Sequence, residues 1–184
     1  MTPFPFVVID GIDGAGKTTA ARMLAGQLGA HYYKTPSGIF ERMRADIEAL
    51  KDNLVRFSFY LTAVIHDSAE IAEILKKQPV ICDRYIFSTV AYHKALGVPM
   101  SYCNIDELPI LTPDFSFYLY ADMAICAQRM KKRGITSSSD AMLERDKQLQ
   151  QAIHEEFLRL PVVLVDSSTL SPEQVCETIM THMA

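Results

Sequence analysis

Short runs of apolar or aromatic residues recur along the chain, each followed by a turn rich in Gly, Pro, Asp or Ser. Such runs suit buried strands and are too short for buried helices. Strands are therefore predicted at 6–9, 31–34, 79–82, 115–120 and 162–165. The longer stretches between them carry apolar residues at helical spacing and predict helices at 19–28, 39–51, 53–77, 86–96, 122–133, 140–159 and from 172 onward.

Strands that alternate with helices predict a parallel sheet with helices on both faces, an α/β fold. Ligands of such sheets bind beyond the carboxyl ends of the strands. The polar residues that follow each predicted strand are therefore the first candidates for a functional site.

Composition and charge narrow the class of protein. The 184 residues predict one domain, 1–184, and the net charge of −4 argues against nucleic acid as a main partner. No apolar stretch reaches the ~18 residues of a membrane span, so no membrane association is expected. Four widely spaced cysteines without a C-x-x-C pair predict reduced, mostly buried thiols in a cytoplasmic protein.

One stretch carries a specific chemical signal. Residues 11–18 read Gly-Ile-Asp-Gly-Ala-Gly-Lys-Thr and match the P-loop pattern G-x-x-x-x-G-K-[ST]. In this interpretation Lys17 reaches the β- and γ-phosphates of a bound nucleoside triphosphate, and the Thr18 hydroxyl ligates Mg²⁺. The predicted triphosphate (ATP) site comprises Gly11, Asp13, Gly14, Ala15, Gly16, Lys17, Thr18 and Thr19.

Acidic and basic residues beside this loop suggest phosphoryl transfer. Asp83 ends an apolar strand and would complete the Mg²⁺ site, although it could instead only cap the next helix. Arg84 could hold a second phosphate or form a salt bridge. Asp13 lies inside the P-loop and should point away from the triphosphate, toward an acceptor hydroxyl; the alternative is a solvated loop Asp.

A lid is predicted after the helix at 122–133. Arg129 and Arg133 share one helix face, and the polar segment that follows, about 134–142, suits a lid that closes over nucleotide. Arg133 is favoured as a catalytic lid residue, and for Arg129 lid, base-stacking and structural roles all stay open. Phe59 could stack on a nucleobase, but helical periodicity alone favours a core position.

Four stretches, 8–19, 80–92, 112–119 and 129–134, together resemble the thymidylate kinase family of P-loop nucleoside monophosphate kinases. The first two are specific when they occur in this order. The resemblance implies a three-layer α/β/α fold with five parallel strands in the order 2-3-1-4-5. It also implies γ-phosphoryl transfer from ATP, with Mg²⁺, to the 5′-phosphate of a deoxynucleotide by a homodimer.

The resemblance also implies roles for single residues. Asp13 would hold the acceptor sugar's 3′-hydroxyl, Arg84 its phosphate, and Phe59 its base. The remaining roles implied are Tyr92 against the sugar, Ser88 in the same acceptor set, Arg129 on adenine and Arg133 on the transferred group.

Three positions depart from the family pattern. Residues 35–38 lack the family's acid or arginine after the second strand, so Arg42 or Arg44 is expected to cover the acceptor phosphate. Ala63 stands where the family has a base-reading arginine, and His93 where it commonly has Gln. Thymidylate is the leading acceptor, with a deoxynucleoside kinase and a non-catalytic nucleotide-binding protein as alternatives. A GTPase is disfavoured because the chain has no N-K-x-D motif.

Overall fold

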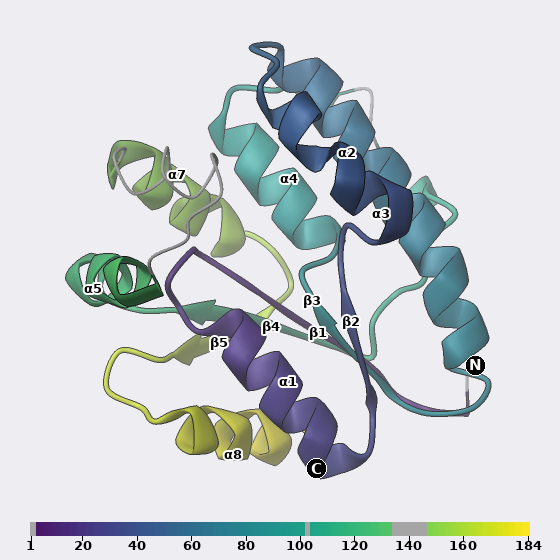
Figure 1. The fold of residues 1–184 in the computed structure, drawn as a ribbon, viewed down its shortest axis with the longest axis vertical. Helices are drawn as coiled ribbons and strands as arrows, with labels where there is room; N and C mark the ends of the chain where they lie inside the picture. Colours follow the sequence, from purple (N-terminus) through teal and green to yellow (C-terminus); the bar gives the residue numbers. More distant parts are fainter. Residues whose placement is uncertain (1–2, 102–103, 134–146) are drawn as a thin grey trace.

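Five parallel strands form the centre of the molecule in the order β2-β3-β1-β4-β5 (Figure 1), which confirms the predicted sheet. The computed structural model describes residues 3–101, 104–133 and 147–184. The strands are β1 (Phe6–Gly11), β2 (His31–Lys34), β3 (Val80–Asp83), β4 (Phe115–Tyr120) and β5 (Val163–Asp166). Each begins within one residue of its predicted start.

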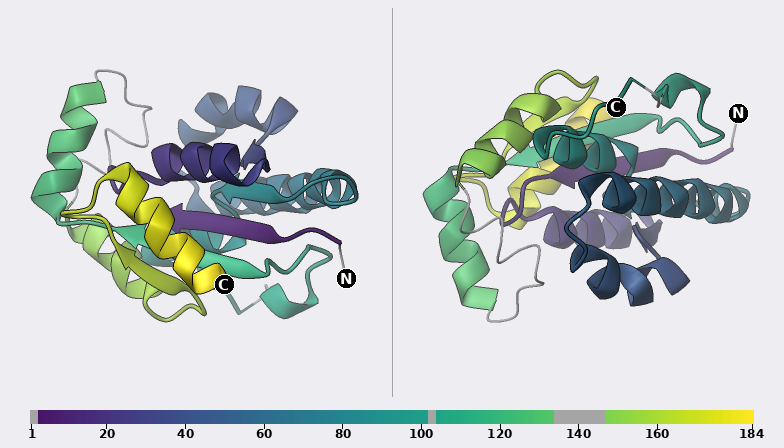
Figure 2. Two further views of the ribbon diagram at one scale, coloured as in Figure 1. Left: turned by 90° about the horizontal axis from the view of Figure 1, so that it is seen from below. Right: turned by 90° about the horizontal axis from the view of Figure 1, so that it is seen from above.

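Helices cover both faces of this sheet. α1 and α8 pack together on one face, whereas α3, α4 and α7 lie on the other, with α2 against α3 (Figures 1 and 2). The helices described are α1 (Lys17–Leu28), α2 (Gly38–Glu48), α3 (Asn53–Ile74), α4 (Ile86–Ala95), α5 (Met123–Arg133), α7 (Lys147–Phe157) and α8 (Pro172–Met183). A short 3₁₀ helix, Ile105–Glu107, was not predicted. Residues 140–146 of the predicted helix at 140–159 lie outside the described residues.

Local capping explains two of the helix starts. The Asp52 side chain accepts hydrogen bonds from the backbone amides of Leu54 and Val55. This cap begins α3 and separates it from α2 where the sequence predicted a helix boundary. Ser171 and Gln174 form a reciprocal capping box at the start of α8. These caps satisfy backbone donors that the first helical turn leaves unpaired.

The alternating side chains of β1 enter two separate cores. Val7 and Ile9 pack with Leu24 of α1 and other buried residues, whereas Phe6 and Val8 pack with residues of α3 such as Ile71. Burial on both faces fixes the register of β1 in the sheet. The carboxyl end of β1, where the P-loop begins, therefore has a fixed position relative to the neighbouring strands.

Two findings bear on the sequence-level expectations about environment. None of the described helices is both long and apolar enough to cross a membrane. Cys82, Cys126 and Cys176 are buried free thiols, and Cys103 lies outside the described residues.

Candidate active site

The P-loop connects β1 to α1 and lies directly against the neighbouring backbone. A Cβ atom on Gly11 would come within 2.1 Å of the Leu119 carbonyl oxygen, and one on Gly14 within 2.6 Å of the Cys126 carbonyl oxygen. Gly14 also has a left-handed φ of 86°. No side chain caps the first turn of α1 at Gly16. The loop therefore presents backbone N–H groups at a helix N-terminus, which is an anion-binding arrangement.

Lys17 lies buried beside this loop. Its Nζ donates to the Ile12 carbonyl oxygen at 2.7 Å and lies 3.5 Å from Asp13 Oδ1. Burial, with a smaller contribution from the Arg84 charge, lowers the pKa of Lys17 to about 8. A phosphate at the loop would add negative charge beside this desolvated ammonium.

Thr18 and Asp83, the two predicted magnesium ligands, lie together. The Thr18 hydroxyl donates to Asp83 Oδ2 at 2.6 Å, and the Tyr32 hydroxyl donates to the same oxygen at 3.1 Å. Asp83 is 2% exposed and ends β3 next to β1. A hydroxyl and a carboxylate at this spacing are oxygen ligands of the kind that Mg²⁺ takes.

Asp13 and Arg84 form an ion pair from the P-loop to the turn after β3. Arg84 has a left-handed backbone, with φ of 72°, and its guanidinium lies 5.0 Å from the ring centroid of Tyr92. Burial alone would raise the pKa of Asp13, but the charges of Arg84 and Lys17 hold it below its ordinary value. Asp13 is therefore an ionised carboxylate between two cations, not a solvated loop residue.

Asp10 supports the same turn and was not singled out in the sequence. Its Oδ1 accepts from the Tyr85 backbone amide at 3.1 Å and from the Ser88 hydroxyl, and burial raises the pKa of its carboxyl group. The predicted substrate residue Ser88 thus uses its hydroxyl on Asp10, although it still lines the cavity described next. A lone carboxylate inside the apolar run of β1 was the signal available for Asp10.

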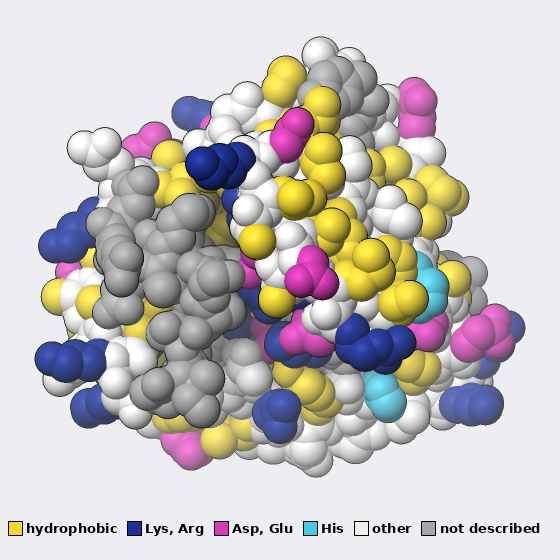
Figure 3. Space-filling view, turned by 45° about the horizontal axis from the view of Figure 1, so that its top comes forward, with side chains coloured by type: hydrophobic (Ala, Val, Ile, Leu, Met, Phe, Trp, Pro, Cys, Tyr) yellow, Lys and Arg dark blue, Asp and Glu magenta, His cyan; other side chains and the backbone are white. Residues whose placement is uncertain are grey.

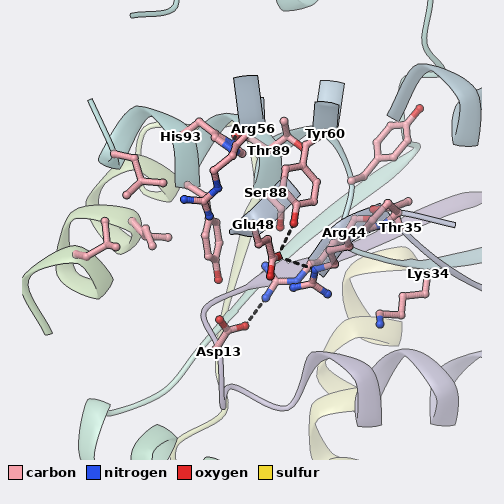
Figure 4. Close-up of a pocket in the computed structure, with 17 residues that line it drawn as sticks. Asp13, Lys34, Thr35, Arg44, Glu48, Arg56, Tyr60, Ser88, Thr89 and His93 are labelled. Carbon is pink, nitrogen blue, oxygen red and sulfur yellow. Dashed lines mark hydrogen bonds and ion pairs between the residues drawn. The ribbon is translucent and has the colours of Figure 1, made fainter. Parts of the chain in front are cut away.

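A cavity opens between the P-loop, α2, α3, α4 and α7 (Figure 4). The space among its lining atoms, with the open solvent at its mouth included, amounts to about 790 Å³. We call it the acceptor cavity. Its wall includes Asp13, Arg44, Arg84, Ser88 and Tyr92, five of the residues predicted for the acceptor.

A second hydrogen-bonded group on this wall was missed by the sequence analysis. Arg44 Nε donates to Glu48 Oε1 at 2.7 Å, and the Tyr60 hydroxyl donates to the same oxygen at 2.6 Å. The Glu48 side chain is only 4% exposed. Glu48 thus fixes the Arg44 side chain from one side in the wall of the cavity.

Phe59, predicted to stack on the acceptor base, does not line the acceptor cavity. Its ring packs against Phe40 and Tyr60, with centroids 5.6 Å and 5.4 Å away. The next residue, Tyr60, occupies the cavity wall instead. One residue turns a helix by about 100°, which a sequence pattern of mixed aromatic residues does not resolve. Ala63, at the position of the family's base-reading arginine, is buried.

A second cavity lies on the other side of the P-loop and includes Ala15, Gly16, Thr19 and Arg129 in its wall. Arg129 donates to the Ser167 carbonyl oxygen at 2.8 Å and to its hydroxyl at 3.2 Å. Ser167 in turn donates to the Ala15 carbonyl oxygen at 2.7 Å. Arg129 therefore joins the loop after β5 to the P-loop. The side chain of Arg133 and the predicted lid, about 134–142, lie outside the described residues.

Known proteins are similar to this chain over nearly its whole length. The family model described as thymidylate kinase matches residues 9–179. A probable thymidylate kinase of Methanocaldococcus jannaschii is 30% identical over 183 residues, covering 97% of this chain and 95% of the relative. One of Pyrococcus abyssi is 30% identical over 197 residues, covering 95% and 93%.

Solved structures show the same fold. The thymidylate kinase of Candida albicans superposes with a TM-score of 0.76 at 19% identity, covering 98% of this chain and 91% of that one. The thymidylate kinase of Ehrlichia chaffeensis gives a TM-score of 0.70 at 21% identity, covering 98% of each chain.

Proposed function

The chain belongs to the thymidylate kinase family, and from that premise we propose that it transfers the γ-phosphoryl group of ATP to a deoxynucleoside monophosphate, with thymidylate as the acceptor. The observation that carries the proposal is the Asp13–Arg84 pair. It joins the triphosphate loop to the wall of a separate cavity, so that a donor and an acceptor can meet at one point.

On the donor side, the chain supplies positive charge and a backbone cradle. Lys17 and the first-turn amides of α1 would hold the β- and γ-phosphates at the carboxyl edge of β1. Arg129, fixed by Ser167, stands beside the second cavity, where the adenine would lie. We keep Arg133 as the proposed lid residue that neutralises the transferred group.

Magnesium fits the residues at the end of β3. Thr18 and Asp83 already share a hydrogen bond of 2.6 Å, so their two oxygens converge on one point beside the P-loop. Thr18 and Asp83 would hold Mg²⁺ there, and the bound ion would supply positive charge that offsets the negative charge of the transferred phosphoryl group. The Tyr32 hydroxyl keeps the Asp83 carboxylate oriented.

On the acceptor side, the chain aligns a nucleotide without forming a covalent bond to it. Arg84 and Arg44 would hold the acceptor 5′-phosphate, and the ionised Asp13 would accept a hydrogen bond from the sugar hydroxyl. The Tyr92 ring would lie against the sugar. Catalysis then consists of alignment and charge neutralisation, which is sufficient for phosphoryl transfer.

The test is a turnover assay. Purified protein with ATP and Mg²⁺ is offered nucleosides, ribonucleoside monophosphates and deoxynucleoside monophosphates, and ADP and phosphorylated products are measured. We expect thymidylate to give dTDP, and Lys17→Met to lower the rate at least ~10³-fold. Turnover of nucleosides alone would favour the deoxynucleoside kinase alternative, and ATP binding without turnover the non-catalytic one.

We further propose that the chain forms a homodimer through α2 and the start of α3. Large hydrophobic side chains gather there on the surface (Figure 3): Ile39, Met43, Leu50, Leu54 and Val55 are each 43–52% exposed. Exposed apolar groups that cluster in this way mark interaction surfaces. Light scattering should give twice the chain mass of 20.6 kDa, and Met43→Glu should shift the mass toward the monomer.

The three buried thiols support a cytoplasmic location. Cys82, Cys126 and Cys176 are unpaired in the interior, where a reducing compartment would leave them. Fractionation of cells that produce the protein would test this proposal.

A further inference from the structure

Two residues in the wall of the acceptor cavity each carry a buried polar atom that has no hydrogen-bond partner among the described residues. Arg56 Nε and His93 Nε2 are shielded from solvent, and nothing in the described ranges 3–101, 104–133 and 147–184 hydrogen-bonds to either. Both residues line the acceptor cavity. An unpaired buried polar group costs free energy comparable to a lost hydrogen bond, so two of them in one cavity point to a polar ligand.

The hydrogen-bonding role of His93 is fixed by its other ring nitrogen. Nδ1 lies 2.7 Å from the Thr89 carbonyl oxygen, and a carbonyl only accepts, so Nδ1 carries the proton. Burial lowers the pKa of His93 to about 4, so the ring is neutral near pH 7. Nε2 is then an acceptor and nothing else, and its partner must present an N–H or O–H.

Arg56 presents the complementary group from α3. One terminal nitrogen donates to Asn53 Oδ1 at 3.4 Å, and Asn53 itself donates to the Leu96 carbonyl oxygen at 3.1 Å. This contact uses a terminal nitrogen and leaves Nε unpaired, and Figure 4 shows Arg56 near His93 and Tyr60 in the cavity wall. Its partner must be an acceptor.

Two aromatic rings lie beside His93. The His93 ring lies 5.5 Å from the ring of Tyr60 and 5.5 Å from that of Phe57, measured between centroids. Leu96, Leu149 and Ile153 complete an apolar wall. An apolar, partly aromatic pocket with a few oriented polar atoms suits a flat heterocycle.

We propose that Arg56 and His93 together read the hydrogen-bonding edge of the acceptor base, a task that Ala63 cannot perform. The inference rests on the proposed function, because it assigns this cavity to the acceptor nucleotide. The base class it selects is an imide, in which one ring N–H lies between two carbonyl groups. The N–H donates to His93 Nε2, and a carbonyl accepts from Arg56.

An imide edge satisfies Arg56 and His93 together better than the hydrogen-bonding edges of the other bases do. It places an acceptor on both sides of its single N–H, so Arg56 meets a carbonyl whichever side it approaches. The cytosine edge presents a bare ring nitrogen where the imide has N–H, and the adenine edge likewise. The guanine edge places a second donor on one side of its N–H. Thymine and uracil are therefore the expected bases.

The first test uses the unaltered chain. Thymidine 5′-monophosphate is compared with its N3-methyl derivative, which has lost the N–H and is otherwise similar. We expect kcat/KM to fall at least ~100-fold for the methylated nucleotide, because a buried acceptor is left unpaired. Equal use of the two nucleotides would overturn the proposal without any variant being made.

The second test separates base reading from folding. Arg56→Gln should raise KM for thymidylate about 10- to 100-fold and change kcat less than ~3-fold, since the contact is made equally in the ground and transition states. The same variant should use 2-deoxyribose 5-phosphate, which has no base, as well as the unaltered chain does. Arg159→Gln, whose parent side chain is 63% exposed and lies away from the cavity, is the matched control.

His93→Leu completes the design. This substitution should reduce the fall in kcat/KM for the N3-methyl nucleotide to less than ~10-fold, because the methyl group then meets an apolar side chain. Arg56→Gln losing the base-free phosphate as strongly as thymidylate would overturn base reading and leave the kinase activity intact. Failure of the unaltered chain to bind any 5′-monophosphate, measured by calorimetry, would overturn the proposed function itself.

Discussion

Arg84 pairs with Asp13, a residue 71 positions earlier in the chain, and the contact joins the P-loop to the turn that follows β3. Each partner was expected to touch substrate, and in the structure each satisfies the other's charge. The pair thus keeps both charges ionised and in place in a partly buried site.

Asp13→Asn should remove that charge while keeping the shape of the side chain. We expect kcat for thymidylate to fall about 10²- to 10³-fold, because the acceptor loses its orienting carboxylate. KM for ATP should change less than ~5-fold. Steady-state kinetics with each substrate varied would measure both. The exposed Asp106 offers a matched control as Asp106→Asn, and an equal loss in both variants would contradict the assignment.

Thr18→Val should weaken metal binding specifically. The substitution keeps the branched shape and deletes the hydroxyl that lies 2.6 Å from Asp83 Oδ2. The Mg²⁺ concentration giving half-maximal activity, at fixed ATP, is expected to rise at least ~10-fold. Thr18→Ser retains the hydroxyl and should stay within ~3-fold of the original chain. Identical magnesium curves for the two variants would argue against the predicted ligand.

Lys17→Met should stabilise the nucleotide-free protein while abolishing its activity. Burial lowers the pKa of Lys17 from 10.5 to about 8, so the unfolded chain binds the proton more tightly than the folded one. Wild-type stability should therefore rise with pH between about 8 and 10.5. At pH 7 we expect the variant to be more stable by about 1–3 kcal/mol, a gain that shrinks toward pH 10.5. Urea unfolding at several pH values measures this difference. A variant that is less stable than the original chain at pH 7 would contradict the argument.

Gly14→Ala and Gly26→Ala make a matched pair. At Gly14 the new Cβ would lie 2.6 Å from a backbone oxygen at a φ of +86°, and we expect a loss of about 2–4 kcal/mol. Gly26 lies inside α1. Apart from its chain neighbours and the nearby backbone of its own helix, no atom of the described residues comes within 4 Å of a Cβ added there, so alanine should gain about 0.5–1 kcal/mol. Thermal and urea unfolding measure both, and equal effects would refute the steric argument.

We expect His93 to make the folded protein less stable in acid. Its pKa is depressed in the folded protein, from 6.5 to about 4, so the unfolded state takes up a proton first as pH falls. Between pH 6.5 and 4 this should cost up to about 3 kcal/mol. His93→Gln removes this titrating group. The unfolding free energy of the variant should therefore fall less steeply, as pH falls from 6.5 to 4, than that of the unaltered chain. Parallel curves for the two proteins would place the His93 pKa near its ordinary value.

The sequence predicted what depends on local pattern. The strands, the P-loop, the break at Asp52 and the strand order that the family resemblance implied were all confirmed. The Thr18–Asp83 contact was also expected, because both residues follow or end adjacent strands.

What the sequence missed depends on how helices are rotated and on partners distant in the chain. Tyr60 rather than Phe59 reaches the acceptor cavity because neighbouring helix positions face different directions. Arg56 and His93 are 37 positions apart, and only the packing of α3 against α4 brings them to one cavity. No periodicity in the sequence encodes that meeting.

The buried Asp10 has a consequence for how alignment is achieved. Its carboxylate, at the end of β1, holds the Tyr85 amide and the Ser88 hydroxyl at the start of α4. The strand that leads into the donor loop and the helix that carries acceptor residues thus share one anchor inside the core. Much of the orientational entropy of bringing two substrates together is therefore lost when the chain folds, before either substrate arrives.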